Sequence, residues 1–458
     1  MVQKLILILL ATSMLACQQP KAQPKEFTQE QLQEDLNQLF YALKTYHPGL
    51  YWYQDSEAFA QQIAKAEASI KNGQDFAEFY KTVNLLTSSI GCGHTRPRMP
   101  ANRSRQLIDS VLILPLQVFV HGGKVFTTKE IADIPLGSQI VSVDKYKIAD
   151  IIKQLRAVVP SDGHNTTGKD NFIAQRFGLM LALYLDIQGS QTKTTASVGY
   201  IVPDTKSVKK MEINFQPFSN NQQANQGPLM NFKDADMPDT KILRIRTFSS
   251  GTLNRNGFNY YDFLKNAFTQ LKEEHTKNFI IDVRGNGGGD DHYGATLVSY
   301  IANQSFKYFD RIEVTEAYDG YGKIEEEEGR RLMRSHQDLA LQQPKKNRFR
   351  GKVFILADGG SFSTTADFVS IAKNIKAATI IGIETGGGAC GNTSGRSESL
   401  KLANTGISLR IQTWGYFSAI NKNLICGSGV LPDYEVVDFP FTVEDEMLEQ
   451  VSALLKGG

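Results

Sequence analysis

Apolar residues follow two different spacings in the first half of the chain. Over residues 27–100 they recur every three or four positions, which is the pattern of amphipathic helices. The clearest stripe consists of Leu32, Leu36, Phe40 and Leu43. Over residues 101–218 the apolar runs are short and strand-like, as in VLILPLQVFV, QIVSVD and MEINF. The pattern therefore predicts an N-terminal helical region followed by a β-rich domain.

Apolar runs and helical stretches alternate in the second half of the chain. The runs are KILRIRTF, NFIIDV, KVFILAD, ATIIGIET and GISLRIQTW, and helical stretches such as YYDFLKNAFTQLKEE separate several of them. This alternation favours an α/β layer architecture for residues 229–458. Within it, the charge-rich stretch at about 310–350 is expected to form an exposed helical insertion. The polar run SNNQQANQGP, residues 219–228, is predicted to be a linker.

The N-terminus has the features of an export signal. Lys4 precedes the apolar stretch LILILLATSMLA, which is too short to span a bilayer but has the length of a signal-peptide core. The stretch ends in LAC, which resembles the bacterial lipoprotein signal, where cleavage precedes a cysteine that becomes lipidated. We therefore expect a signal peptide over 1–17, lipid on Cys17 and a polar tether over 18–26. An ordinary secretory signal with an incidental cysteine is the alternative.

These N-terminal features predict a location. The protein is expected in the bacterial cell envelope, outside the cytoplasm, and anchored to a membrane by its lipid in the periplasm or at the cell surface. No other stretch of the chain is long and apolar enough to span a bilayer.

The composition excludes several classes of function. Lys and Arg number 50 against 48 Asp and Glu, so the net charge of +2 gives no support for nucleic acid as a partner. The histidines show no H-E-x-x-H pattern and no cysteine pair has zinc-finger spacing, so we expect neither a metal nor a cofactor. Apart from Cys17, the cysteines are Cys92, Cys390 and Cys426. This odd number allows one disulfide with a free thiol, or three buried thiols.

Two glycine-containing turns follow apolar strands and carry the candidate chemistry. They are FIIDVRGNGGGDD (279–291) and KVFILADGGSFSTTADF (352–368). The second turn presents a serine where a strand gives way to a helix, and backbone N–H groups there can hold negative charge. Together the two turns predict a hydrolase site. A dinucleotide-binding interpretation of the first turn is weaker, because Asp290 stands where a third glycine is needed and would repel a pyrophosphate.

Several motifs, taken in chain order, resemble those of one peptidase family. GCGHTRPR, LRIRTF, IIDVRGNGGG, GGSFSTTADF, IETGGGACGNTSG and GVLPDYEV resemble the S41 serine peptidases, the tail-specific or C-terminal-processing proteases and their tricorn-like relatives. The resemblance covers most of residues 27–440. It implies a ClpP/crotonase-like α/β catalytic core with an N-terminal helical cap and a PDZ-like domain. Residues 134–155 resemble the later half of a PDZ domain, and a generic β-rich spacer is the alternative.

The resemblance implies roles for residues of both turns. It makes Ser363 the nucleophile, with Ser361 as the competing candidate and a helix N-cap as the non-catalytic alternative. The glycines of the first turn let the backbone approach a substrate carbonyl. We expect Gly288, with its neighbour Gly287 and the N–H of Thr364, to hold the oxyanion.

The same resemblance indicates which residue activates the serine. No lysine occurs between Lys376 and Lys401, where tail-specific proteases carry their base, so a Ser–His arrangement is expected in place of Ser–Lys. His94 in GCGHTRPR occupies the position of the tricorn-like histidine, and His292 is the reserve candidate.

The acid that orients the histidine is missing from its expected position. Tricorn-like enzymes have a glutamate where this chain has Cys426, and Cys92 stands where relatives often have an aspartate. Asp433 or Glu435 is the alternative acid. A disulfide among the cysteines around the cleft is a further hypothesis.

The sequence thus predicts a serine endopeptidase that hydrolyses unfolded or C-terminal polypeptide segments outside the cytoplasm. The alternative is a catalytically weak S41-like protein that binds peptides or small hydrophobic ligands in the same cleft. A crotonase-like acyl-transfer enzyme would share the oxyanion architecture but would need an acyl-CoA.

Overall fold

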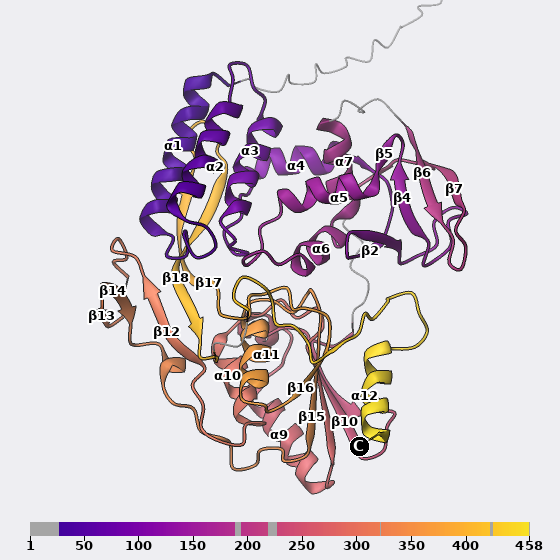
Figure 1. Ribbon diagram of the computed structural model, residues 1–458, viewed down its shortest axis with the longest axis vertical. Helices are drawn as coiled ribbons and strands as arrows, with labels where there is room; N and C mark the ends of the chain where they lie inside the picture. Colours follow the sequence, from indigo (N-terminus) through magenta and orange to yellow (C-terminus); the bar gives the residue numbers. More distant parts are fainter. Residues whose placement is uncertain (1–26, 188–193, 219–226, 321, 422–424, 458) are drawn as a thin grey trace, which may run out of the picture.

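The computed structural model describes residues 27–187, 194–218, 227–320, 322–421 and 425–457. The expected signal peptide, its Cys17, the tether and most of the expected linker lie outside the described residues. Within the described ranges, no helix has both the length and the apolar character needed to cross a membrane. Figure 1 shows an upper half, built mainly from the first half of the chain, above a lower half built from the second.

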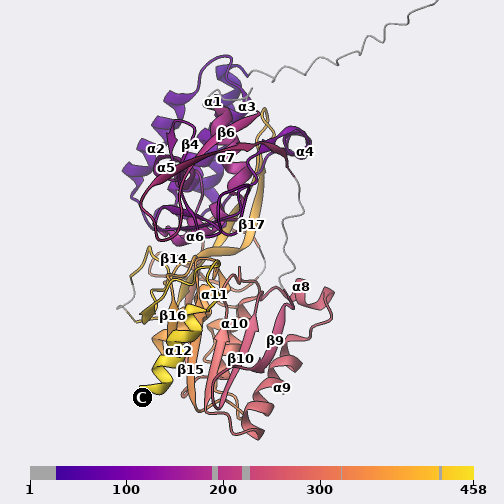
Figure 2. The same cartoon turned by 90° about the vertical axis from the view of Figure 1, so that its right-hand side faces the viewer.

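Three N-terminal helices form a cap on a hairpin from the other end of the chain. The helices are α1 (Gln29–Tyr46), α2 (Ser56–Ser69) and α3 (Phe76–Ser89), and the hairpin strands are β17 (Thr393–Lys401) and β18 (Ser408–Ser418). The side chains of Thr28, Asp55 and Asp75 accept backbone N–H groups in the first turns, so each helix begins at a capping residue. The apolar stripes of the helices pack against buried hairpin residues such as Leu409 and Ile411. Figures 1 and 2 show this hairpin rising from the lower half into the cap.

The rest of the upper half is a small antiparallel sheet covered by helices. Its strands, in the order β2-β3-β4-β6-β7 with β5 beside β4, are β2 (Val118–His121), β3 (Lys124–Thr127), β4 (Gln139–Val143), β5 (Tyr146–Lys147), β6 (Thr195–Ile201) and β7 (Val208–Asn214). A separate short pair consists of β1 (Leu112–Ile113) and β8 (Gln216–Pro217). The helices are α4 (Ala101–Ser110), α5 (Ile148–Ala157), α6 (Thr167–Ala174) and α7 (Phe177–Ile187). Apolar residues of α5, α6 and α7 share one core with the sheet, because each of these helices buries apolar side chains against it.

The lower half contains the mostly parallel sheet that positions the candidate site. Its strands, in the order β19-β16-β15-β11-β10-β9, are β9 (Met230–Asp234), β10 (Thr240–Ile245), β11 (Asn278–Asp282), β15 (Lys352–Ala357), β16 (Thr379–Gly382) and β19 (Tyr434–Glu435). The helices are α8 (Ser250–Arg255), α9 (Tyr260–Glu273), α10 (Asp291–Ser299), α11 (Thr364–Asn374) and α12 (Glu446–Lys456). β10, β11, β15, β16 and β19 pair in parallel, and only β9 is antiparallel.

Apolar side chains project from both faces of this sheet and are buried there, which explains the continuous apolar runs of β11 and β15. One face contributes to the large core beneath α9, α10 and α11, and the other packs on α12. Both runs end at the same edge of the sheet, since parallel strands point the same way. The α/β core with a helical N-terminal region, which the sequence predicts, is confirmed.

The expected helical insertion at about 310–350 is wrong. The stretch forms β12 (Phe309–Val314), β13 (Ile324–Glu327), β14 (Arg330–Met333) and a single 3₁₀ turn, Gln337–Leu339. Glu328 and Gly329 both have positive φ angles, 52° and 75°, and this pair makes the tight turn of a hairpin. Acidic residues of β13 lie opposite basic residues of β14, as Glu327 does opposite Arg330. The acidic run is therefore one strand of a charged hairpin.

Candidate active site

Ser363 lies between β15 and α11 in a backbone conformation that non-glycine residues rarely adopt. Its φ and ψ angles are 56° and −131°, and such conformations cost on the order of 1–3 kcal/mol. Hydrogen bonds to the neighbouring turn hold it: Phe362 N–H donates to Asn286 O, and Ser361 Oγ donates to Val283 O. The Ser363 hydroxyl makes no capping hydrogen bond to the helix. The fold therefore presents this hydroxyl for another partner.

That partner is His94. Its Nε2 lies 3.1 Å from Ser363 Oγ, although the two residues are 269 positions apart in the sequence. The imidazole packs against the ring of Phe362, with centroids 4.8 Å apart. Burial, with a smaller effect of the Arg96 charge, lowers the pKa of His94 to about 3. At neutral pH the imidazole is therefore uncharged and can accept a proton at Nε2.

No acid among the described residues orients the other nitrogen of this imidazole. His94 Nδ1 is buried and has no hydrogen-bond partner among the described residues. The alternative in which Asp433 orients it is wrong, because that carboxylate accepts from Ile380 N–H and pairs with Lys373 instead. Glu435 is exposed on the edge strand β19, and the unpartnered His94 Nδ1 makes no hydrogen bond with it. The arrangement is thus a Ser–His pair without a visible acid.

The competing residues are occupied elsewhere. Ser361 is completely buried and its hydroxyl is bonded to Val283 O, so it does not reach His94. His292 Nδ1 lies 2.7 Å from Asp338 Oδ1, and this carboxylate raises the pKa of His292. Neither of these residues contacts the Ser363 hydroxyl.

The glycine-rich turn packs directly on the nucleophile. A side chain at Gly288, where φ is 92°, would lie 2.6 Å from Phe362 O and 2.9 Å from Ser363 Cβ, so only glycine fits. The N–H of Gly288 donates to Asn286 Oδ1, which differs from the expectation that it is a free oxyanion donor. Within the described chain, the N–H groups of Thr364 and Gly287 have no acceptor. Thr364 starts helix α11, whose N-terminal dipole also favours an anion.

A polar segment from the upper half packs beside the site, and the sequence reasoning missed it. Residues 161–170, which end the connection from α5 and begin α6, bind loops of the lower half. Asp162 is buried, and its carboxylate accepts from Gly93 N–H at 2.8 Å and from Gly388 N–H at 3.2 Å. Asn165 Nδ2 donates to Thr385 O at 2.6 Å. The cluster SDGHN has turn-forming composition, but nothing local indicates what it contacts.

Asp162 should make stability depend on pH in a predictable direction. Burial, opposed by weaker hydrogen bonds, raises the pKa of Asp162 from 3.8 to about 6. The folded protein therefore holds this proton more tightly than the unfolded chain, so the associated stability is present below pH 4. It is lost as the pH rises through about 6, by on the order of 3 kcal/mol.

The test compares Asp162→Asn with the parent protein across that range. The melting temperature of the variant, relative to the parent, should rise between pH 4 and pH 7 because the asparagine stays uncharged. Asp236→Asn, at an exposed position, is the control and should show no such trend. A pH-independent difference for Asp162→Asn would mean that Asp162 is not the titrating group.

The cysteines around the site are partly joined. Cys390 and Cys426 form a disulfide. Cys92 is a buried free thiol whose Sγ accepts a hydrogen bond from the Thr393 hydroxyl. The disulfide ties the loop after β16 to the segment that carries Gly429. The bond lies where the family resemblance places a glutamate, so a covalent tie occupies the position of the missing acid.

Loss of this disulfide should destabilise the lower half. It closes a loop of 36 residues, for which chain entropy gives about 4 kcal/mol. We expect the double variant Cys390→Ser, Cys426→Ser to unfold at clearly lower urea concentration. This double variant should not respond to reductant. Cys92→Ala is the matched control: it keeps the disulfide, so reductant should lower its midpoint as it does for the parent. Equal midpoints for the reduced and oxidised parent would contradict the expectation.

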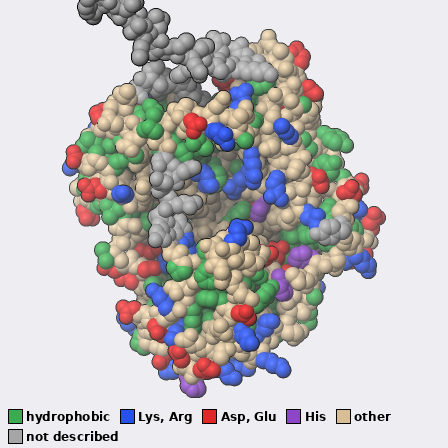
Figure 3. Space-filling view, turned by 180° about the vertical axis from the view of Figure 1, so that it is seen from behind, with side chains coloured by type: hydrophobic (Ala, Val, Ile, Leu, Met, Phe, Trp, Pro, Cys, Tyr) green, Lys and Arg blue, Asp and Glu red, His purple; other side chains and the backbone are tan. Residues whose placement is uncertain are grey.

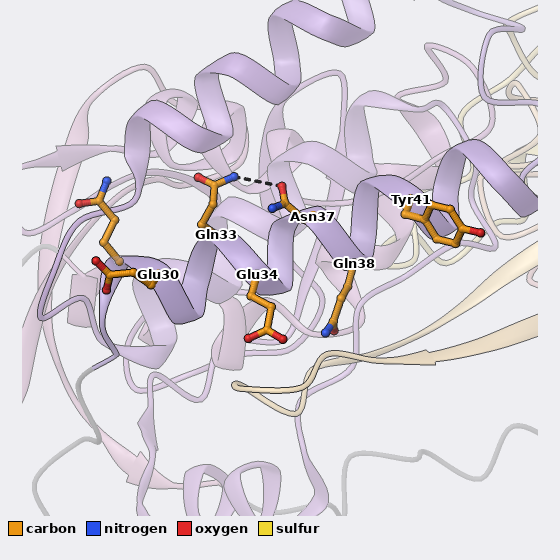
Figure 4. A pocket seen from close by; sticks show the side chains of 7 residues that line it. Glu30, Gln33, Glu34, Asn37, Gln38 and Tyr41 are labelled. Atoms are coloured by element: carbon orange, nitrogen blue, oxygen red, sulfur yellow. Dashed lines mark hydrogen bonds between the residues drawn. The ribbon is translucent and has the colours of Figure 1, made fainter.

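Other surface hollows and polar clusters of the described residues lack the side chains of a catalytic or metal site. A shallow trough of about 830 Å³ runs along the exposed side of α1 and is lined by Gln29, Glu30, Gln33, Glu34, Asn37, Gln38 and Tyr41. Figure 4 shows how these side chains lie along the helix. It contains no serine or histidine and lies in the cap, away from Ser363. Among the described residues, no group of His, Cys, Asp and Glu side chains could hold a metal ion.

Comparison with known proteins gives a family match within the second half of the chain and a likeness of fold over most of it. Residues 239–436 match the model of peptidase family S41. The fold is similar to that of mature CPAF, with a TM-score of 0.67 and 14% identity over 93% of this chain and 97% of that chain. A structure of mature CPAF complexed with lactacystin gives 0.66 and 14% over 93% and 98%. The photosystem II D1 C-terminal processing protease gives 0.44 and 16% over 93% and 97%. No curated protein matches the chain by sequence.

Proposed function

Because residues 239–436 make this chain a serine-type peptidase of family S41, we propose that it is an endopeptidase for unfolded or C-terminal polypeptide segments. In this proposal Ser363 is the nucleophile and His94 is the general base. The observation that carries it is the 3.1 Å contact between His94 Nε2 and Ser363 Oγ. Two segments distant in the sequence are brought together with the geometry that serine activation requires.

The reaction would proceed by acyl transfer. Ser363 Oγ attacks the peptide carbonyl carbon while its proton passes to His94 Nε2. The oxyanion lies against the N–H of Thr364, with Gly287 as the second donor, or Gly288 once its bond to Asn286 is released. His94 then protonates the amine that leaves. Water next attacks the acyl-enzyme and gives its proton to His94, which returns that proton to Ser363 Oγ as the acid product leaves.

The absence of a hydrogen-bond partner for His94 Nδ1 among the described residues should lower the catalytic rate. In triads an acid holds the histidine and stabilises the imidazolium, and removing its charge costs about 10⁴-fold in kcat. This protein lacks such an acid among the described residues, so its turnover should be low. The same observation motivates the second candidate function, a weak enzyme that mainly binds peptides or small hydrophobic ligands in the cleft.

The partly buried site supports an extended substrate. Segment 161–170 joins the loops on both sides of the Ser363–His94 pair, since Gly163 N–H bonds Gly91 O and His164 N–H bonds Gly427 O. Ser363 and His94 are both partly buried. A single extended chain reaches partly buried side chains more readily than a folded domain does.

The proposed location is outside the cytoplasm, with a lipid on Cys17 as the anchor. The N-terminal sequence supports this location, and so does the Cys390–Cys426 disulfide, because disulfides persist in oxidising compartments.

The function is tested with matched folded and unfolded substrates. The soluble form that begins after Cys17 is incubated with reduced, carboxymethylated lysozyme and with native lysozyme. Cleavage of the unfolded form alone is expected. Equal cleavage of both forms would contradict the substrate proposal, and cleavage of neither, together with peptide binding, would favour the second candidate function.

A further inference from the structure

Two arginines contact the same aromatic ring beside the Ser363–His94 pair. The guanidinium carbon of Arg96 lies 4.8 Å from the centroid of Phe172, and that of Arg176 lies 4.1 Å from it. Phe172 belongs to α6 and Arg176 follows this helix, whereas Arg96 comes from the loop that carries His94. Two separate segments of the chain therefore bring two positive charges to one place.

Arg96 connects this pair of charges to the surroundings of Ser363 and His94. Arg96 also contacts the ring of Phe362, at 5.9 Å, and the imidazole of His94 packs on that same ring. Phe362 directly precedes Ser363. The Arg96 charge also contributes to the lowered pKa of His94, after the larger effect of burial.

Neither arginine is neutralised by a carboxylate. Within the described chain, no Asp or Glu oxygen lies within 4.0 Å of either guanidinium; the hydrogen bonds present are from Arg96 Nε to Gly93 O and from Arg176 to Gln175 Oε1. Asp162 attracts Arg96, but its oxygens accept the N–H groups of Gly93 and Gly388.

The like charges are held together at a cost. Burial lowers the pKa of both arginines, and Arg176 lowers that of Arg96 further. Arg96 is half-buried and Arg176 is exposed. Neighbouring like charges disfavour each other unless an anion lies between them. On the face in Figure 3, Lys and Arg side chains gather around a hollow between the upper and lower halves.

We propose that Arg96 and Arg176 form an anion subsite that binds a substrate carboxylate close to the scissile bond. The carboxylate is either an Asp or Glu side chain or the free C-terminus of the polypeptide. Guanidinium groups suit this ligand because their donors match the two carboxylate oxygens. This inference rests on the proposed function and adds a substrate class to it. Charge-assisted hydrogen bonds of this kind are worth about 10- to 100-fold in affinity.

Binding to the Ser363→Ala protein tests the subsite without relying on turnover. Short fluorescein-labelled Ala–Gly peptides are compared by anisotropy in two matched pairs: free acid against C-terminal amide, and internal Glu against internal Gln. We expect about 10- to 100-fold tighter binding of the carboxylate member in one pair, which identifies its source. Arg96→Gln and Arg176→Gln should each remove most of this preference. Arg103→Gln is the matched control, since Arg103 stacks on Phe76 in the same way but on α4.

The outcomes separate the subsite from the catalytic proposal. Absence of any carboxylate preference, or a preference unchanged in both arginine variants, would overturn the subsite and leave the arginines as stacking contacts only. An arginine-dependent preference in a protein whose Ser363 form cleaves none of these peptides would keep the subsite and count against the catalytic proposal.

Discussion

Replacing Ser363 by alanine is expected to lower kcat on unfolded polypeptide by about 10³- to 10⁴-fold. Ser363 Oγ is the hydroxyl bonded to His94 Nε2, so the variant has no nucleophile in contact with the base. The expected loss is below that of complete triads because the parent enzyme already lacks an acid at Nδ1. Peptide release by mass spectrometry over time measures it.

The matched control is Ser361→Ala, two residues away. Ser361 is buried and its hydroxyl donates a hydrogen bond to Val283 O. Its replacement should therefore lower the free energy of unfolding but have little effect on kcat. Ser363→Gly gives a second check: it should be as inactive as Ser363→Ala but about 1 kcal/mol more stable than it, since glycine tolerates the φ of 56°. Full activity in Ser363→Ala would remove this residue as the nucleophile.

Replacing His94 by alanine should cause a loss of similar size, about 10³- to 10⁴-fold in kcat. The histidine also predicts a pH profile. Its pKa of about 3 is far below the ordinary value of 6.5, so almost all of the imidazole is in the active, uncharged form already at pH 5. The acid limb of kcat/KM, which reports the free enzyme, should therefore lie well below pH 6.

The control for this prediction is His292→Ala, because His292 pairs with Asp338 and does not contact the nucleophile. Its activity and pH profile should match those of the parent. An acid limb near 6.5 would mean that His94 is better solvated than the structure shows. A limb near 6 that disappears in Asp162→Asn would belong to Asp162.

Local sequence predicts the parts of the site that are built locally. The two turns after β11 and β15 are readable because each combines an apolar strand, glycines and a polar helix start within about ten residues. The structure shows why Gly288 must be glycine, since it packs on Ser363 Cβ. The use of its N–H by Asn286 depends on side-chain geometry that no pattern encodes.

Long-range contacts explain what the sequence did not reveal. The Asp162 carboxylate accepts hydrogen bonds from the N–H groups of Gly93 and Gly388, which are 69 and 226 residues away. No local pattern in the sequence could therefore predict its position beside the site. The same holds for the β17–β18 hairpin that completes the core of the cap. The error at β13 and β14 has a local cause: a charge-rich stretch is typical of an exposed helix, but the positive φ angles of Glu328 and Gly329 form the tight turn of a hairpin.

Labelling with a fluorophosphonate probe tests the central claim most directly. The probe reacts with serines activated by a neighbouring base, so the soluble protein should gain a single adduct. Peptide mapping should place that adduct on Ser363, and His94→Ala should not acquire it. An adduct on Ser361 or on another serine would contradict the account, and so would labelling of Ser363 that persists unchanged without His94.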